Sequence, residues 1–299
     1  MIQANQMVIK KDRKSGWLRV FVTGLLLFFA GLVIMLLAGN PNLFPTMVMI
    51  GNFLVPVTFV AFFYERRRLS QLSLPTTALS FFYGGVLGVL AASILEPIFI
   101  RQSDIFTVFT VGFIEEFVKI LGVLMIARRW RHDQEMDGLV LGAAAGMGFA
   151  ALESSGYAFS AFLLSRGSLS AVVIVTLLRG ILSPVGHGTW TAILASVLFR
   201  ESNGNRFHIN RKVLGTYFTV AILHGLWDGV PGLVAVLFSS GLDVLVSQFL
   251  IGGLGLLILW RRWREAKRLQ VEQQQSFLDG VTAEEIPSLM TRSKEEIRL

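Results

Sequence analysis

Ionisable side chains of types used in acid–base and metal chemistry interrupt four successive hydrophobic stretches of the sequence. They are Glu115, Glu116, Lys119, Glu153, Arg179, His187, His224 and Asp228. Charged groups within a bilayer are costly, and they usually serve a function. Lys119 follows the two glutamates by four and three positions, so on a helix it can partly neutralise them. Asp228 follows His224 by four and can orient the imidazole and set its tautomer.

Three more side chains share helix faces with these groups. Tyr157 lies four positions after Glu153, and Thr191 lies four positions after His187. The sixth hydrophobic stretch thus presents one face that carries Arg179, Ser183, His187 and Thr191. We expect Lys119, Asp228, Tyr157 and Thr191 to support the site rather than to react.

These residue types suit hydrolysis of a peptide bond by an activated water. The reaction needs a base for the water, an acid for the leaving amine and stabilisation of the oxyanion. Zinc is an alternative activator, because histidine and glutamate are its common ligands. Its candidate ligands are Glu116, Glu153, His187 and His224. At this stage zinc and no metal at all both remain open. An HExxH motif is absent, and Ser183 is not expected to be a nucleophile.

The composition identifies the environment. The chain is 53% hydrophobic and 16% charged, with a mean hydropathy of +0.62. These values are typical of a multi-pass membrane protein. The sequence has no cysteine, which excludes disulfides, thiolate catalysis and cysteine-based metal sites. The net charge is +7, but the basic residues flank hydrophobic stretches, so they indicate topology rather than a nucleic-acid partner.

Eight stretches are long enough to cross a bilayer, and they predict an all-α membrane bundle. They cover approximately 17–38, 44–64, 77–100, 105–127, 138–164, 169–199, 213–238 and 242–260. The sixth contains Pro184 and is expected to kink or tilt. Lys and Arg concentrate in alternate connections, which predicts two cytoplasmic termini in the plasma membrane. We expect a membrane domain over 1–263 and a polar cytoplasmic tail over 264–299 that begins as a continuation of the last helix.

Counting residues along each helix predicts that the polar groups lie at one depth in the membrane. Glu116, Glu153, His187 and His224 each lie about 17–23 Å from the Lys/Arg-rich side, at 1.5 Å per residue. Four helices running in alternating directions therefore carry their polar groups in one layer. The catalytic core is expected over about 105–240. The four-residue spacing of Gly138, Gly142 and Gly146 predicts close helix packing.

Four short elements resemble those of the PrsW-type intramembrane proteases. "EEFVK" (115–119) is similar to their EExxK element and "FAALESSGY" (149–157) to their FxxxExxxY element. "HGTWT" (187–191) and "HGLWD" (224–228) resemble their two histidine elements. The resemblance implies catalysis by Glu115, Glu116 and His187, with Glu153 and His224 completing the site. It also implies membrane-anchored substrates, such as anti-sigma factors, and it leaves metal dependence open.

The family is distantly similar to the CAAX prenyl endopeptidases. Those relatives carry a histidine in the second motif, where this chain has Glu153, so prenyl-protein processing is the less expected substrate class. Buried ionisable groups also suit an ion- or proton-coupled secondary transporter, or a sensor that binds a partner helix without cutting it. A membrane-anchored protein substrate and the lipid bilayer are the expected partners, and the oligomeric state stays undetermined.

Overall fold

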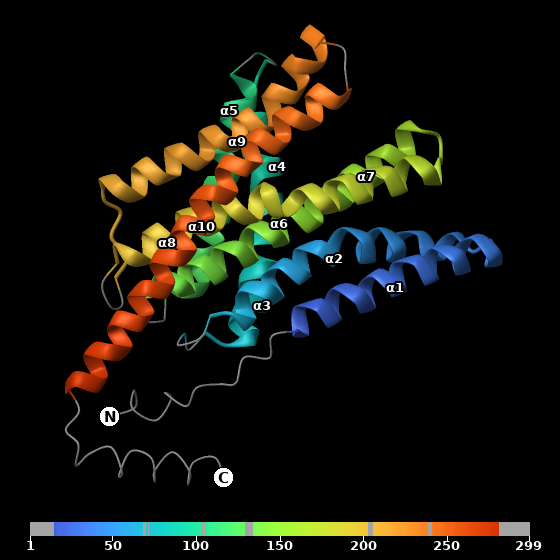
Figure 1. Cartoon of the computed structure of the whole chain (residues 1–299). Helices are drawn as coiled ribbons and strands as arrows, with labels where there is room; N and C mark the ends of the chain where they lie inside the picture. Colours follow the sequence, from blue (N-terminus) through green and yellow to red (C-terminus); the bar gives the residue numbers. More distant parts are fainter. Residues whose placement is uncertain are drawn as a thin grey trace, which may run out of the picture.

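A bundle of helices makes up the structure, a computed structural model that describes residues 15–67, 70, 72–102, 104, 106–128, 134–202, 206–238 and 241–280. No strand occurs within these ranges. Its main helices are α1 (Gly16–Ala38), α2 (Phe44–Glu65), α3 (Leu74–Phe82), α4 (Gly88–Phe99), α5 (Thr107–Ala127), α6 (Glu135–Leu164), α7 (Leu169–Leu182), α8 (His187–Arg200), α9 (Arg211–Phe238) and α10 (Gly241–Gly280) (Figure 1). The expected all-α membrane bundle is therefore confirmed.

The membrane spans match the expected stretches, with two internal irregularities. In the described chain, seven helical segments are long and apolar enough to cross a membrane. The remaining expected span, the fourth along the chain, is α5, which has 21 residues but carries Glu115, Glu116 and Lys119. A π-helical segment, η3 (Tyr83–Leu87), joins α3 to α4. The 3-10 turn η4 (Ser183–Val185) separates α7 from α8, so the sixth span is broken at Pro184.

Helices α6 and α8 form the most extensive helix pair and the centre of the core. The expected close packing through small residues is confirmed here. A side chain at Gly138, Gly142 or Gly146 would overlap the backbone of Ala195, Thr191 or His187, respectively. The two backbones therefore lie in direct contact. This contact sets the position of the α8 residues that face the site.

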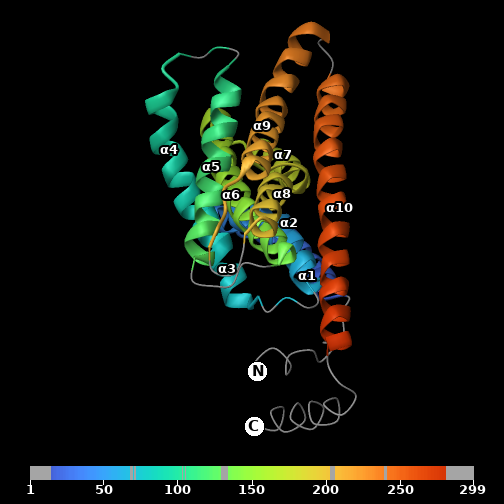
Figure 2. The ribbon, with the colours of Figure 1, turned by 90° about the vertical axis from the view of Figure 1, so that its left-hand side faces the viewer.

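The last helix ties the bundle together at one end. Helix α10 runs 40 residues, so the polar tail does begin as a continuation of the last span. Arg262 pairs with the buried Glu135 at the start of α6, and Gln270 donates to the Arg67 carbonyl after α2. In Figure 2, α10 and α4 lie at opposite edges, with α6 and α8 between them. We call the end of the bundle that carries Glu135 and Gln270 the basal end.

Part of the expected organisation lies outside the described residues. This holds for the basic N-terminal segment with Lys10 and Lys11, the basic connection over 129–132, and tail residues 281–299.

Candidate active site

Helix α5 carries two glutamates and a lysine into the interior. Glu116 and Lys119 are fully buried, and Glu115 is 5% exposed. Lys119 Nζ donates hydrogen bonds of 2.9 Å to Glu115 Oε2 and to Glu116 Oε1. The helix spacing produces this arrangement, because residues three and four apart lie on one face. The result is one ammonium between two carboxylates, with a net negative charge.

The break before α8 places His187 at the first position of that helix. Pro184 cannot continue α7, and Thr189 Oγ1 donates to its carbonyl, which anchors the turn. His187 Nδ1 lies 2.8 Å from Lys119 Nζ, and Nε2 lies 3.2 Å from Glu153 Oε2. An ammonium only donates hydrogen bonds, so Nδ1 accepts and the ring proton of the neutral imidazole is on Nε2. The break also divides the expected continuous face, since Arg179 lies before it and Ser183 is its first residue.

Glu116 contacts the second histidine, His224, through the Nδ1 atom of its ring. Its Oε2 accepts a 2.9 Å hydrogen bond from Thr191 Oγ1, and its Oε1 lies 3.1 Å from His224 Nδ1. A carboxylate accepts, so Nδ1 of His224 carries a proton and donates it. The other ring nitrogen, Nε2, is buried without a hydrogen-bond partner in the described chain. It lies 3.5 Å from Glu115 Oε2 and 3.4 Å from Asp228 Oδ2.

One side of this centre opens to partly exposed polar groups. Arg179 NH2 donates to Glu153 Oε2 at 2.6 Å, and its Nε donates to Ser154 Oγ. The Arg179 guanidinium lies over the Tyr157 ring, 3.9 Å from its centroid. The side chains of Glu153, Arg179 and Asp228 are 20%, 29% and 36% exposed. The buried groups therefore border partly exposed polar side chains on this side.

Aromatic rings close the remaining sides. Lys119 Nζ lies 4.1 Å from the Phe149 ring centroid, which stabilises the ammonium. Trp190 is fully buried, with its ring centroid 4.8 Å from that of His224, and it packs edge-on against Trp227. These rings place apolar surface against the Lys119 ammonium and the His224 imidazole.

The comparison with protein families decides between the alternatives for this site. The sequence model of the PrsW family of intramembrane metalloproteases matches residues 73–268. The chain belongs to this family. No curated protein and no solved structure matches it. Membership makes the protein an intramembrane protease, a peptide hydrolase, and sets aside the transporter and the non-catalytic sensor. The matched region extends beyond the expected core of 105–240 and contains all the site residues above.

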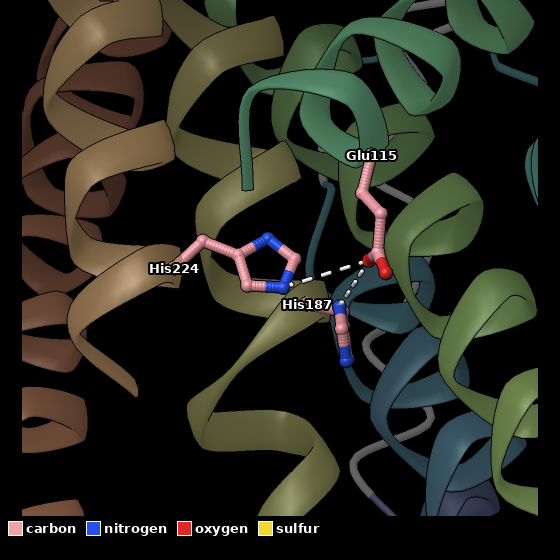
Figure 3. A group of neighbouring side chains, drawn as sticks. All are labelled: Glu115, His187 and His224. Atoms are coloured by element: carbon pink, nitrogen blue, oxygen red, sulfur yellow. Dashed lines mark ion pairs between the residues drawn. The ribbon is translucent and has the colours of Figure 1, made fainter. Parts of the chain in front are cut away.

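Membership in the PrsW family raises the question of where a metal would bind. Ligand atoms of Glu115, His187 and His224 lie within 4.8 Å of one another. Figure 3 shows the Glu115 carboxylate beside both imidazoles, with ion-pair distances of 3.7 Å to His187 and 3.5 Å to His224. Two imidazoles and one carboxylate are a common donor set of catalytic zinc, and the unpartnered Nε2 of His224 has a lone pair to offer. The residues therefore fit a divalent ion.

This group differs from the expected ligands in its carboxylate. The oxygens of Glu116 accept hydrogen bonds from Lys119, Thr191 and His224, and Glu153 Oε2 accepts one from Arg179. Glu116 instead orients His224, as carboxylates behind zinc-binding histidines do.

Sequence reasoning missed one carboxylate, Glu96 of α4. It lies close enough to Glu115 and Glu153 for their charges to act on it. Its signal in the sequence was the same as that of the others, a carboxylate inside a hydrophobic stretch. Glu96 lies three residues before the end of α4, a position typical of side chains that contact lipid headgroups.

Proposed function

We propose that this PrsW-family chain hydrolyses peptide bonds of membrane-anchored proteins, including regulators of the anti-sigma-factor kind, with a water activated between Glu115 and His224. The observation that supports this most strongly is the meeting of Glu115, His187 and His224 in a buried place between α5, α8 and α9. Three separate helices contribute one reactive side chain each. A packing role alone does not account for three costly groups at one point in the membrane interior.

The two adjacent glutamates take different parts in this proposal. Only Lys119 donates to Glu115 among the described residues, and it does so at Oε2, which leaves Oε1 available to a water. Glu115 accepts a proton as the water oxygen adds to the peptide carbonyl carbon. The same proton then goes to the leaving nitrogen as the carbon–nitrogen bond breaks. Glu116 is a positioning residue, because its hydrogen bonds hold Lys119, Thr191 and His224.

The surrounding groups support the charge changes. The Lys119 ammonium lies next to the reacting groups and favours the negative charge that develops on the carbonyl oxygen. A divalent ion, when held by Glu115, His187 and His224, supplies a Lewis acid and a more acidic water. Glu115 would then be a ligand, and Asp228, whose Oδ2 lies 3.4 Å from His224 Nε2, is a partly exposed carboxylate beside the group.

The orientation belongs to the same proposal. We place the chain in the plasma membrane with both termini cytoplasmic, 1–263 as the membrane domain and 264–299 as a cytoplasmic tail. Glu65 near the end of α2 approaches Gly16 at the start of α1, and Gln270 of α10 bonds the backbone after α2. The first helix therefore begins at the basal end, and the last helix ends there too.

Proteolysis in liposomes tests the activity. The purified chain is reconstituted with a panel of single-span membrane proteins, and cleavage is followed by mass spectrometry. Glu115→Gln and His224→Ala should each slow cleavage by at least about 100-fold, within the range for losing an acid–base group. Glu265→Gln, on α10 and far from the site, is the matched control and should cleave at the wild-type rate. Wild-type rates in Glu115→Gln would contradict the assignment.

A further inference from the structure

Lys119 lies where a cation is expected in the candidate metal group. Its Nζ has three hydrogen-bond partners: Glu115 Oε2 at 2.9 Å, Glu116 Oε1 at 2.9 Å and His187 Nδ1 at 2.8 Å. An ammonium has three N–H donors, so all are in use. Two of the three partners, Glu115 and His187, are members of the group that could hold an ion.

The ammonium and an ion need the same atom on His187. In the neutral ring, Nδ1 has one lone pair, and here that lone pair accepts from Lys119. The other nitrogen, Nε2, lies 3.2 Å from Glu153 Oε2, on the far side of the ring. A divalent ion bound through Nδ1 must therefore displace Lys119 from His187. Repulsion between a dication and a fixed ammonium a few ångströms away adds to this competition, because both would be buried among the same side chains.

The ammonium has a place to remain after such a displacement. It keeps Glu116 Oε1 at 2.9 Å and the face of Phe149, with Nζ 4.1 Å from the ring centroid. Glu116 is not a member of the metal group, so this anchor does not compete with the ion. The carboxylate that orients His224 is thus also the one that can retain Lys119.

We propose that Lys119 is a built-in competitor that sets the metal affinity of the site, by holding Glu115 and His187 until a divalent ion displaces it from His187 Nδ1. The inference rests on the ion position used in the proposed function. It concerns binding rather than turnover. Its consequence is a weakly metal-binding enzyme, whose occupancy follows the free metal concentration.

Titration with Co²⁺ tests the proposal, since visible absorption bands report the ligand geometry without any need for activity. The full chain is purified in detergent without metal and titrated with Co²⁺, then with competing Zn²⁺. Lys119→Gln should bind Co²⁺ at least about tenfold more tightly than wild type, because the opposing charge is gone. Lys212→Gln is the control: it removes a lysine whose side chain is 69% exposed at the basal end, and its affinity should equal that of wild type.

A charge-matched variant guards against a folding failure of Lys119→Gln. Glu116→Gln with Lys119→Gln removes one buried anion and one buried cation, so the net charge of the site is unchanged. The amide oxygen at 116 can still accept from His224. This double variant should also bind more tightly than wild type, and adding His187→Ala should abolish the absorption bands.

Equal or weaker binding in the folded double variant would overturn the proposal, and so would a failure of both wild type and variant to bind Co²⁺. Tighter binding in a chain that cleaves no substrate would leave this inference standing and refute the proposed function instead.

Discussion

At the residue scale, neighbours decide what two identical side chains do. Glu115 and Glu116 are adjacent glutamates on one helix, yet Glu116 accepts from three partners and Glu115 from Lys119 alone in the described chain. The two histidines differ in the same way. His187 offers a lone pair at Nδ1, whereas His224 offers one at Nε2, because Lys119 and Glu116 impose opposite tautomers. These two nitrogens lie 3.7 Å and 3.5 Å from Glu115 Oε2, respectively.

The role of Glu153 can be tested at this scale. If Glu153 acts by accepting from His187 Nε2, then Glu153→Gln retains an acceptor and should cleave within about threefold of wild type, whereas Glu153→Ala should lose about 10–100-fold. Cleavage rates in liposomes are compared for both variants. An equal loss in the two would show that the negative charge, balanced by Arg179, matters rather than the hydrogen bond.

At the element scale, two features of the helices build the site. The turn at Pro184 ends α7 and lets α8 begin with His187 facing the centre. The glycine face of α6 lets α8 approach until the backbones touch, which brings Thr191 to Glu116. The first feature depends on a proline that interrupts the helix, and the second on glycines that have no side chain. Both therefore follow from the local sequence.

The glycine face predicts an asymmetry within α6. Gly146→Leu places a side chain against the His187 carbonyl and should destabilise the protein by about 1–3 kcal/mol, the usual cost of overpacking. The same substitution at Gly156, which has open space around it, should be nearly neutral. Thermal unfolding in detergent measures both. A similar loss at the two positions would show that the contact with α8 is not responsible, since leucine has the higher helix propensity at both.

At the scale of the whole molecule, α10 couples the two ends of the sequence. It packs against α9 and α8 and reaches the α2 end through Gln270. Its pair between Arg262 and the buried Glu135 joins it to α6. The spans therefore form one connected bundle, although the family match covers only 73–268.

Breaking that pair should weaken the whole bundle. Arg262→Met leaves Glu135 buried without its cation and should cost about 3–5 kcal/mol, as for other buried ion pairs that lose one partner. The neighbouring Arg261 is exposed, so Arg261→Met is the control and should unfold at the wild-type temperature. If both variants unfold together, the pair contributes no stability.

The proposed orientation can be measured cleanly because the chain has no cysteine. Single cysteines at Gln102 and at Lys212 lie at opposite ends of the bundle, after α4 and at the start of α9. A membrane-impermeant maleimide should label Gln102→Cys in intact cells and Lys212→Cys only after permeabilisation. The reverse pattern would place the termini outside.

The sequence by itself determined the all-α class and the positions of the hydrophobic spans, and it predicted a common depth for their polar groups. Hydrophobic length and residue counting depend only on local order along the chain, so Glu116, Glu153, His187 and His224 could be assigned to one layer in advance. The motif spacing was likewise sufficient to indicate the family, which the match over 73–268 then confirmed. Pro184 marked the irregular sixth span, although its division into two helices became visible only in the structure.

Tertiary structure alone decided which groups meet. Depth along an axis says nothing about rotation around it, and rotation depends on how every side chain packs between helices. Lys119 and His187 are 68 positions apart, and no local pattern predicts that they touch. For the same reason Glu115, rather than Glu116 or Glu153, joined the two histidines in the candidate metal group. Glu96 approached the site because the packing of α4 against α5 brings it there.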